Sequence, residues 1–125
     1  MKVRSAHLGI GVVLFAAALA IGEGGKSVSV NGYVLDSACA FTKDRKKPIS
    51  AQCAEACAKA DSPLVVLADD GKIYWPIADT TPSSGQNEKL MPFAGKRVAV
   101  SGKVYVRAGS TAIVIEKISP ESPAK

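Results

Sequence analysis

The chain has 125 residues, of which 47% are hydrophobic and 22% charged, and its formal net charge is +5 at pH 7. This length allows one domain with a hydrophobic core and leaves no room for a second. A positive charge of this size favours solubility and does not by itself indicate a polyanionic partner.

Residues 1–20 have the pattern of a signal peptide. Lys2 and Arg4 form a basic start, an apolar run follows, and Ala18 and Ala20 fit a cleavage site after Ala20. The apolar run is short for a membrane span, so we expect cleavage and no transmembrane segment in the mature protein. Losing Lys2 and Arg4 would lower the formal charge from +5 to +3. We therefore predict a periplasmic or secreted protein, a setting in which disulfides form readily.

Five segments have the length and alternation of β-strands and predict one β-domain over residues 27–119. Their ranges are 27–36, 63–68, 72–78, 96–106 and 111–119. The residues Asp69-Asp70-Gly71 and Ala108-Gly109-Ser110 predict hairpin turns between the second and third and between the fourth and fifth strands. Residues 120–125 are expected to form a disordered tail.

Alternation also predicts which side chains face the interior. The inward set includes Trp75 and Val106 together with two glycines, Gly32 and Gly102. A glycine inside a strand usually marks a sharp bend or a close approach of two backbones at a barrel corner. Two long strands with such glycines predict a closed barrel rather than a flat sheet.

One short helix is predicted between the first and second strands. Ser50 can cap its N-terminus, the alanines that follow favour helix, and Pro63 comes shortly after its end.

The segment FAGKRVAVSGKVYVRAGSTAIVIEKI (93–118) is similar to the closing hairpin of OB-fold proteins. The wider pattern GYVLDSAC, CAEAC and VVLADDGKIYWP resembles a group of small, exported, uncharacterised bacterial proteins with an OB-like barrel, over most of residues 30–118. The resemblance implies a fold and says little about function. We therefore expect a mainly β protein, a small five-stranded OB-like barrel with one short α-helix between the first and second strands.

The three cysteines are the clearest candidate site. Cys53 and Cys57 are four residues apart on one face of the predicted helix, and Cys39 follows the first strand. A disulfide from Cys39 to either helix cysteine would close a loop of about 15 to 19 residues and stabilise the fold by roughly 3 kcal/mol. One cysteine would remain, and it could link two chains.

Two other interpretations of the cysteines stay open. Three thiolates could bind a soft metal, copper ahead of zinc, with Asp36 as the nearest candidate fourth ligand. Alternatively the cysteines could carry thiol-redox chemistry, since Cys53 lies in the first turn of the helix, where the dipole favours a thiolate.

A second candidate is a ligand-binding face on the barrel exterior, since OB barrels bind oligonucleotides or oligosaccharides on a strand face. Export argues against nucleic acid as the ligand. The candidate residues are three tyrosines with outward parity and a basic loop: Tyr33, Tyr74, Tyr105, Lys43, Arg45, Lys46 and Lys47.

The sequence contains no recognisable catalytic motif. Its one histidine, His7, lies in the predicted signal, and we find no G-x-S-x-G, phosphate loop or paired-carboxylate motif. We expect an exported, non-catalytic binding or accessory module without a resident cofactor, whose partner is a small ligand or an envelope protein. The alternative is a copper- or zinc-binding or thiol-redox protein that uses Cys39, Cys53 and Cys57.

Overall fold

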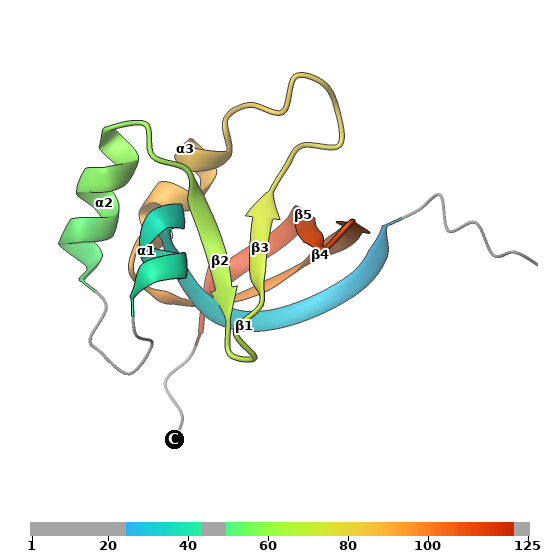
Figure 1. Cartoon of the computed structure of the whole chain (residues 1–125), viewed down its shortest axis with the longest axis horizontal. Helices are drawn as coiled ribbons and strands as arrows, with labels where there is room; N and C mark the ends of the chain where they lie inside the picture. Colours follow the sequence, from blue (N-terminus) through green and yellow to red (C-terminus); the bar gives the residue numbers. More distant parts are fainter. Residues whose placement is uncertain (1–24, 44–49, 122–125) are drawn as a thin grey trace, which may run out of the picture.

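Figure 1 shows the computed structural model, which describes residues 25–43 and 50–121. Five strands close into a barrel in the order β1-β2-β3-β5-β4, and all neighbours are antiparallel except β3 and β5. The strands are β1 (Lys26–Asp36), β2 (Leu64–Ala68), β3 (Ile73–Pro76), β4 (Arg97–Arg107) and β5 (Ser110–Pro120). The predicted small, mainly β, OB-like barrel is confirmed. The predicted signal peptide lies outside the described residues.

The two inward glycines stand where backbones meet most closely. Gly32 pairs with Val98 of β4 and with Ala68 of β2, so it marks the bend at which β1 leaves one neighbour for the other. A Cβ atom on Gly32 would lie 2.2 Å from the backbone oxygen of Leu67. Gly102 adjoins a register shift between β4 and β5, where a Cβ would lie 2.0 Å from a backbone oxygen. The predicted close approach at both glycines is confirmed.

The helices are more numerous than the sequence predicted. Between β1 and β2 the structure has α1 (Ser37–Thr42) as well as the expected α2 (Ala51–Lys59). Between β3 and β4 it has α3 (Gln86–Leu90) and the 3₁₀ turn η1 (Met91–Phe93). Among the residues that the structure describes, no helix is both long and apolar enough to cross a membrane.

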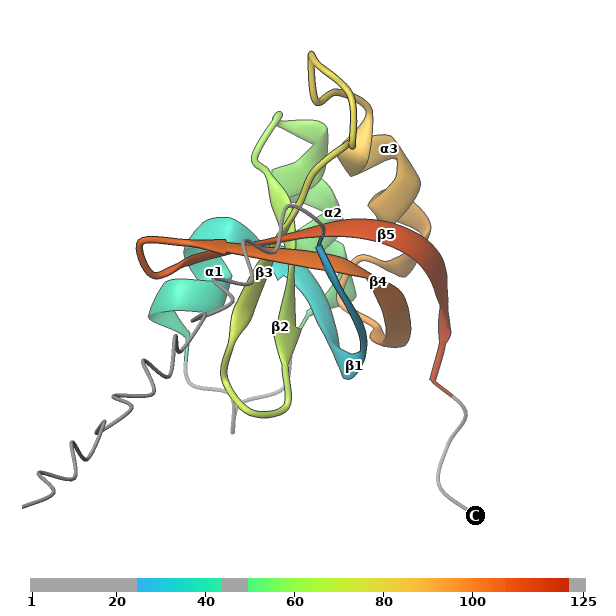
Figure 2. The same cartoon turned by 90° about the vertical axis from the view of Figure 1, so that its right-hand side faces the viewer.

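The barrel interior holds the main core. The helix α3 lies against one end of the barrel in both views (Figures 1 and 2), and its Leu90 is only 1% exposed. The buried residues of this core come from all five strands, α2, and α3: Val34, Ala58, Leu64, Val66, Ala68, Tyr74, Leu90, Val98, Val100 and Ile113. The side chain of Leu90 therefore packs with residues of the strands and closes that end of the core.

A second, smaller apolar cluster covers the outside of β2. Its buried members are Leu35, Ala40, Val65 and Leu67, and Tyr33, Ile73 and Trp75 pack against them. Because α1 contributes Ala40, this helix covers the outer face of the sheet. Both faces of β2 are therefore buried, which explains why its sequence is continuously apolar.

Three predictions of side-chain direction are wrong. Tyr74 was expected outside the barrel, but it is 5% exposed and belongs to the interior core, whereas Trp75 packs in the outer cluster. Val106 was expected inside, but it is 69% exposed. Figure 2 shows the reason, since the turn of the long β4–β5 hairpin projects beyond the rest of the barrel.

The C-terminal end of the barrel also extends further than predicted. The strand β5 continues to Pro120, and the backbone N–H of Glu121 donates to the carbonyl of Arg97 at 3.1 Å. Pro120 and Glu121, which were predicted to be part of the tail, therefore continue the barrel, and residues 122–125 lie outside the described part of the chain.

Candidate functional site

Asp36 connects the barrel to the first cysteine. It is the last residue of β1 and the N-cap of α1, where one carboxylate oxygen accepts the backbone N–H of Cys39 at 3.0 Å. The other oxygen accepts the hydroxyl of Ser62. The residue is 3% exposed, so this carboxylate is a buried charge whose hydrogen bonds offset its desolvation. Asp36 therefore acts as a helix cap, as an aspartate at a strand end often does.

Asn87 of α3 holds the segment that leads into β2, next to the hydroxyl of Ser62 that Asp36 accepts. Its side-chain amide donates to the carbonyl of Ser62 at 2.8 Å and accepts the N–H of Leu64 at 2.8 Å. The intervening Pro63 accepts the backbone N–H of Ser37 at 2.9 Å. The start of β2 is thus held between α1 and α3, and this fixes where α1 presents its cysteine.

The helix α2 carries the other two cysteines. The predicted cap is confirmed, because the hydroxyl of Ser50 accepts the backbone N–H of Cys53 at 3.1 Å. Ala54 and Ala58 are the buried residues of this helix. With those two alanines against the barrel, Cys57 is half-buried and Cys53 is exposed.

Cys39 lies within electrostatic range of Asp36 and of both cysteines of α2, and Cys57 lies within range of Asp36 and Cys53. Burial is the largest cause of a raised pKa at Cys39, followed by the negative charge of Asp36 and by Cys53 and Cys57. Burial also raises the pKa of Cys57, again followed by the charge of Asp36 and by Cys53. A raised pKa keeps these two thiols protonated at neutral pH, which makes them poor nucleophiles.

The geometry narrows the pairings that the cysteines can make. Cys53 and Cys57 do not lie at disulfide distance from each other, and all three cysteines are free thiols in the structure. Within the described ranges, no group of three or more His, Cys, Asp or Glu side chains is arranged to hold a metal ion. A bridge within the chain would therefore join Cys39 to one cysteine of α2.

The buried carboxylate of Asp36 predicts a pH-dependent stability. Burial alone would raise its pKa, but the hydrogen bonds from Ser62 and Cys39 outweigh this effect and lower the pKa below the ordinary value of 3.8. Because the folded pKa is lower than the unfolded one, the stabilisation is complete above the unfolded pKa and disappears as pH falls through the folded pKa. We expect Asp36→Asn to lower the free energy of unfolding by about 1 to 2 kcal/mol at pH 7.

Urea unfolding of the reduced protein at pH 7 and at pH 3 would measure this effect. The difference between wild type and Asp36→Asn should shrink at the lower pH. Asp79→Asn, at an exposed aspartate, is the matched control and should change stability by less than about 0.5 kcal/mol. An Asp36→Asn difference of the same size at both pH values would contradict the prediction.

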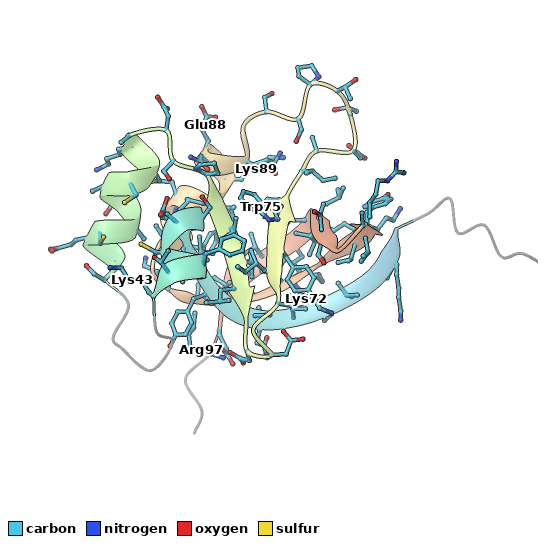
Figure 3. All side chains as sticks on the ribbon, viewed as in Figure 1. Lys43, Lys72, Trp75, Glu88, Lys89 and Arg97 are labelled. Atoms are coloured by element: carbon cyan, nitrogen blue, oxygen red, sulfur yellow. The ribbon has the colours of Figure 1, made fainter. Side chains whose placement is uncertain are left out.

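The predicted ligand-binding tyrosines do not share one surface. Tyr33 is half-buried, with the guanidinium carbon of Arg97 5.0 Å from its ring centroid. Tyr74 is in the core, and Tyr105 is exposed near the start of β1, where it lies close to Gly25. In Figure 3, Lys43 lies beside α1, and Arg45, Lys46 and Lys47 are outside the described residues.

Arg97 is itself held by two carboxylates. It donates two hydrogen bonds of 2.8 Å to Asp69 and one of 2.6 Å to Glu121. These hydrogen bonds raise its pKa further above the ordinary arginine value. The guanidinium over Tyr33 is therefore a fixed cation that connects three segments of the barrel, which leaves that ring less available for stacking on a ligand.

The sequence did not reveal an aromatic pair on the outer face. Phe41 of α1 is 67% exposed, and its ring centroid lies 6.4 Å from that of Trp75 on β3, with the rings tilted by 37°. An open cleft of about 320 Å³ adjoins Trp75. Its lining residues are Asp61, Pro63, Leu64, Trp75, Pro76, Ser83, Ser84, Gly85, Gln86 and Asn87. The signal for this site was the tryptophan itself, which alternation had assigned to the barrel interior.

Comparisons of this chain with models of protein families, with curated proteins and with solved structures found no match. The chemistry of the thiols and of the cleft is therefore the basis for a functional conclusion.

Proposed function

We propose that this chain is an exported, non-catalytic binding or accessory module of the bacterial envelope, in which a disulfide joins Cys39 to Cys53 or Cys57. The observation that carries the proposal is the grouping of thiols from α1 and α2 beside Asp36. Both helices begin at side-chain caps, so their cysteines are held in fixed positions. The raised pKa of Cys39 and Cys57 suits a structural bridge better than a nucleophile.

The outer face of the barrel supports the binding part of the proposal. Exposed aromatic side chains are common in binding surfaces, and Phe41 beside Trp75 presents such a side chain next to an open cleft. Helix α1 carries both Cys39 and Phe41. A bridge from Cys39 to α2 would thus also hold the helix that forms part of this surface.

Intact mass spectrometry of the protein recovered from a periplasm would test the bridge. We expect a mass lower by two hydrogens than the fully reduced chain, one thiol that reacts with an alkylating reagent before reduction, and three that react after it. Reduction should lower the free energy of unfolding by roughly 3 kcal/mol. Cys53→Ser and Cys57→Ser form a matched pair of variants, because only the change at the true partner should leave Cys39 reactive.

The alternative is a soft-metal or thiol-redox protein that uses the same three cysteines. The observation that favours it is that Cys39 lies within electrostatic range of both other cysteines, and thiolates are the ligands that copper(I) and zinc prefer. The described side chains would have to move closer together to hold an ion. Native mass spectrometry separates the two proposals. A metal mass that disappears on denaturation, with three reactive thiols, would overturn the disulfide proposal. A doubled mass that reduction halves would show instead that the odd cysteine joins two chains.

A further inference from the structure

The cleft beside Trp75 has an apolar wall made of rings. It lies where β3 ends at Pro76 and the chain returns toward α3, and Figure 3 shows Trp75 and Lys72 toward opposite ends of β3. The half-buried ring of Trp75, together with Pro63 and Pro76, lines this side, with the fully buried Leu64 beside them. A wall of this kind favours ligands with a flat, weakly polar face.

The remaining lining residues include several polar side chains, and part of their hydrogen-bonding capacity is already used within the protein. The hydroxyl of Ser83 accepts the backbone N–H of Ala78 at 2.8 Å, and the amide nitrogen of Gln86 donates to the carbonyl of Ser84 at 3.0 Å. The side chain of Asn87 is occupied by its two bonds to the start of β2.

Other polar atoms of the lining make none of the hydrogen bonds found in the described part of the structure. Among them are the side-chain oxygen of Gln86, the hydroxyl of Ser84 and the carboxylate of Asp61. All three can accept a hydrogen bond, and the hydroxyl can also donate one. The cleft therefore offers acceptors to a ligand that carries several hydroxyl groups.

The charge of the cleft argues against an anionic ligand, which is the class that a basic protein first suggests. Among the described residues that line it, Asp61 is the one charged side chain, and there is no lysine or arginine. A phosphate or another anion would approach a carboxylate without a neutralising cation, which is unfavourable. The positive charge of the chain as a whole does not extend into this cleft.

We propose that the cleft beside Trp75 binds an uncharged oligosaccharide, an inference that rests on the proposed function as a binding module. A sugar ring has an apolar C–H face, which can lie on the ring of Trp75, and hydroxyl groups at its edge, which can donate to Gln86, Ser84 and Asp61. The volume of about 320 Å³ lies at the lower end of the range of small-molecule sites, and the open side allows a chain of rings to extend beyond it.

The sequence provides a local reporter for this site, since Trp75 is the one tryptophan of the chain. The experiment titrates the periplasmic protein with chitotriose and with cellotriose and records tryptophan fluorescence. We expect a saturable change in intensity or emission wavelength with at least one of the two sugars. Gln86→Ala should weaken the binding about threefold to tenfold, because it removes one hydrogen-bond acceptor from the site.

Gln52→Ala is the matched control, since Gln52 is an exposed residue of α2 outside the cleft lining. It should leave the affinity unchanged, and circular dichroism of both variants would verify that the barrel is folded. The absence of any saturable change with both sugars would overturn the inference. So would binding that Gln86→Ala does not weaken, or a response to a deoxythymidine decanucleotide alone, which would indicate a nucleic-acid ligand.

The mass of each sample, measured before titration, separates this inference from the proposed function. If the bridge is present and no sugar binds, the oligosaccharide inference fails and the disulfide proposal stands. If a sugar binds and the bridge is absent, the disulfide proposal fails and the oligosaccharide inference stands.

Discussion

Replacing Gly32 with alanine should lower the free energy of unfolding by about 3 kcal/mol or more. The added Cβ would lie 2.2 Å from the backbone oxygen of Leu67 and 2.8 Å from the Cα of Ala68. Both atoms belong to the backbone of β2, so no side-chain rotation can relieve the contact. Because Gly32 pairs with β2 and β4 at once, moving either strand away would break hydrogen bonds of the barrel. Urea or thermal unfolding of the folded protein would measure the loss.

Gly109→Ala is the matched control for this prediction. Gly109 has a φ of 84° in the β4–β5 turn, but nothing lies within 4 Å of a Cβ built there. Its cost is therefore limited to the backbone conformation, about 1 kcal/mol. Gly102→Ala, with a Cβ 2.0 Å from the oxygen of Val114, should behave like Gly32→Ala. Equal losses for Gly32→Ala and Gly109→Ala would show that close approach of the strands does not shape the barrel.

Leu90→Ala should cost about 2 to 5 kcal/mol. Leu90 is 1% exposed and packs with interior residues such as Val34 and Val98, so alanine would leave a cavity at one end of the core. Denaturant unfolding followed by circular dichroism would measure the change in stability. Val106→Ala is the comparison for the removal of an apolar side chain, because Val106 is 69% exposed and should contribute less than about 0.5 kcal/mol. A loss below 1 kcal/mol for Leu90→Ala would mean that α3 does not close the core.

The barrel was predictable because its strands follow simple rules. The valines of β1 and β4 alternate with polar residues, since one face of each strand is buried and the other is open. Gly32 and Gly102 interrupt this alternation at positions where a side chain is normally needed, and this predicted the corners. The turn at Gly109 adds a signal that depends only on local backbone conformation.

The direction of the β3 side chains could not be predicted in the same way. Alternation predicts which side chains of a strand point inward only when one face is polar, and β3 is apolar on both faces. Tyr74 packs into the core and Trp75 packs under α1. That helix has six residues, too few for a periodic pattern, so no sequence signal indicated that a helix covers the outer face. The helix α3 was not predicted for the same reason, since it has only five residues and follows a polar loop.

The two candidate sites differ in how much of each could be predicted from local sequence patterns. The grouping of Cys39 with Cys53 and Cys57 followed from helical spacing and from the position of Cys39 after β1. The pair formed by Phe41 and Trp75 needed the placement of α1 on the sheet, which depends on long-range contacts. Local spacing thus indicated the three cysteines as a candidate site, whereas the contact between Phe41 and Trp75 became visible only in the folded chain.

The pairing of β3 with β5 is one of the two shortest in the barrel, equal in length to that of β2 with β3. It consists of Trp75 with Ala112 and Pro76 with Ile113, and Pro76 has no N–H to contribute to the ladder. Short pairings of this kind separate at a lower free-energy cost than long ones, so the barrel should open locally between these two strands before it unfolds globally. Trp75 and Pro76 also line the cleft, so a bound molecule would contact the strand that separates most readily. Occupancy of the cleft and closure of the barrel are then thermodynamically linked, and each would strengthen the other.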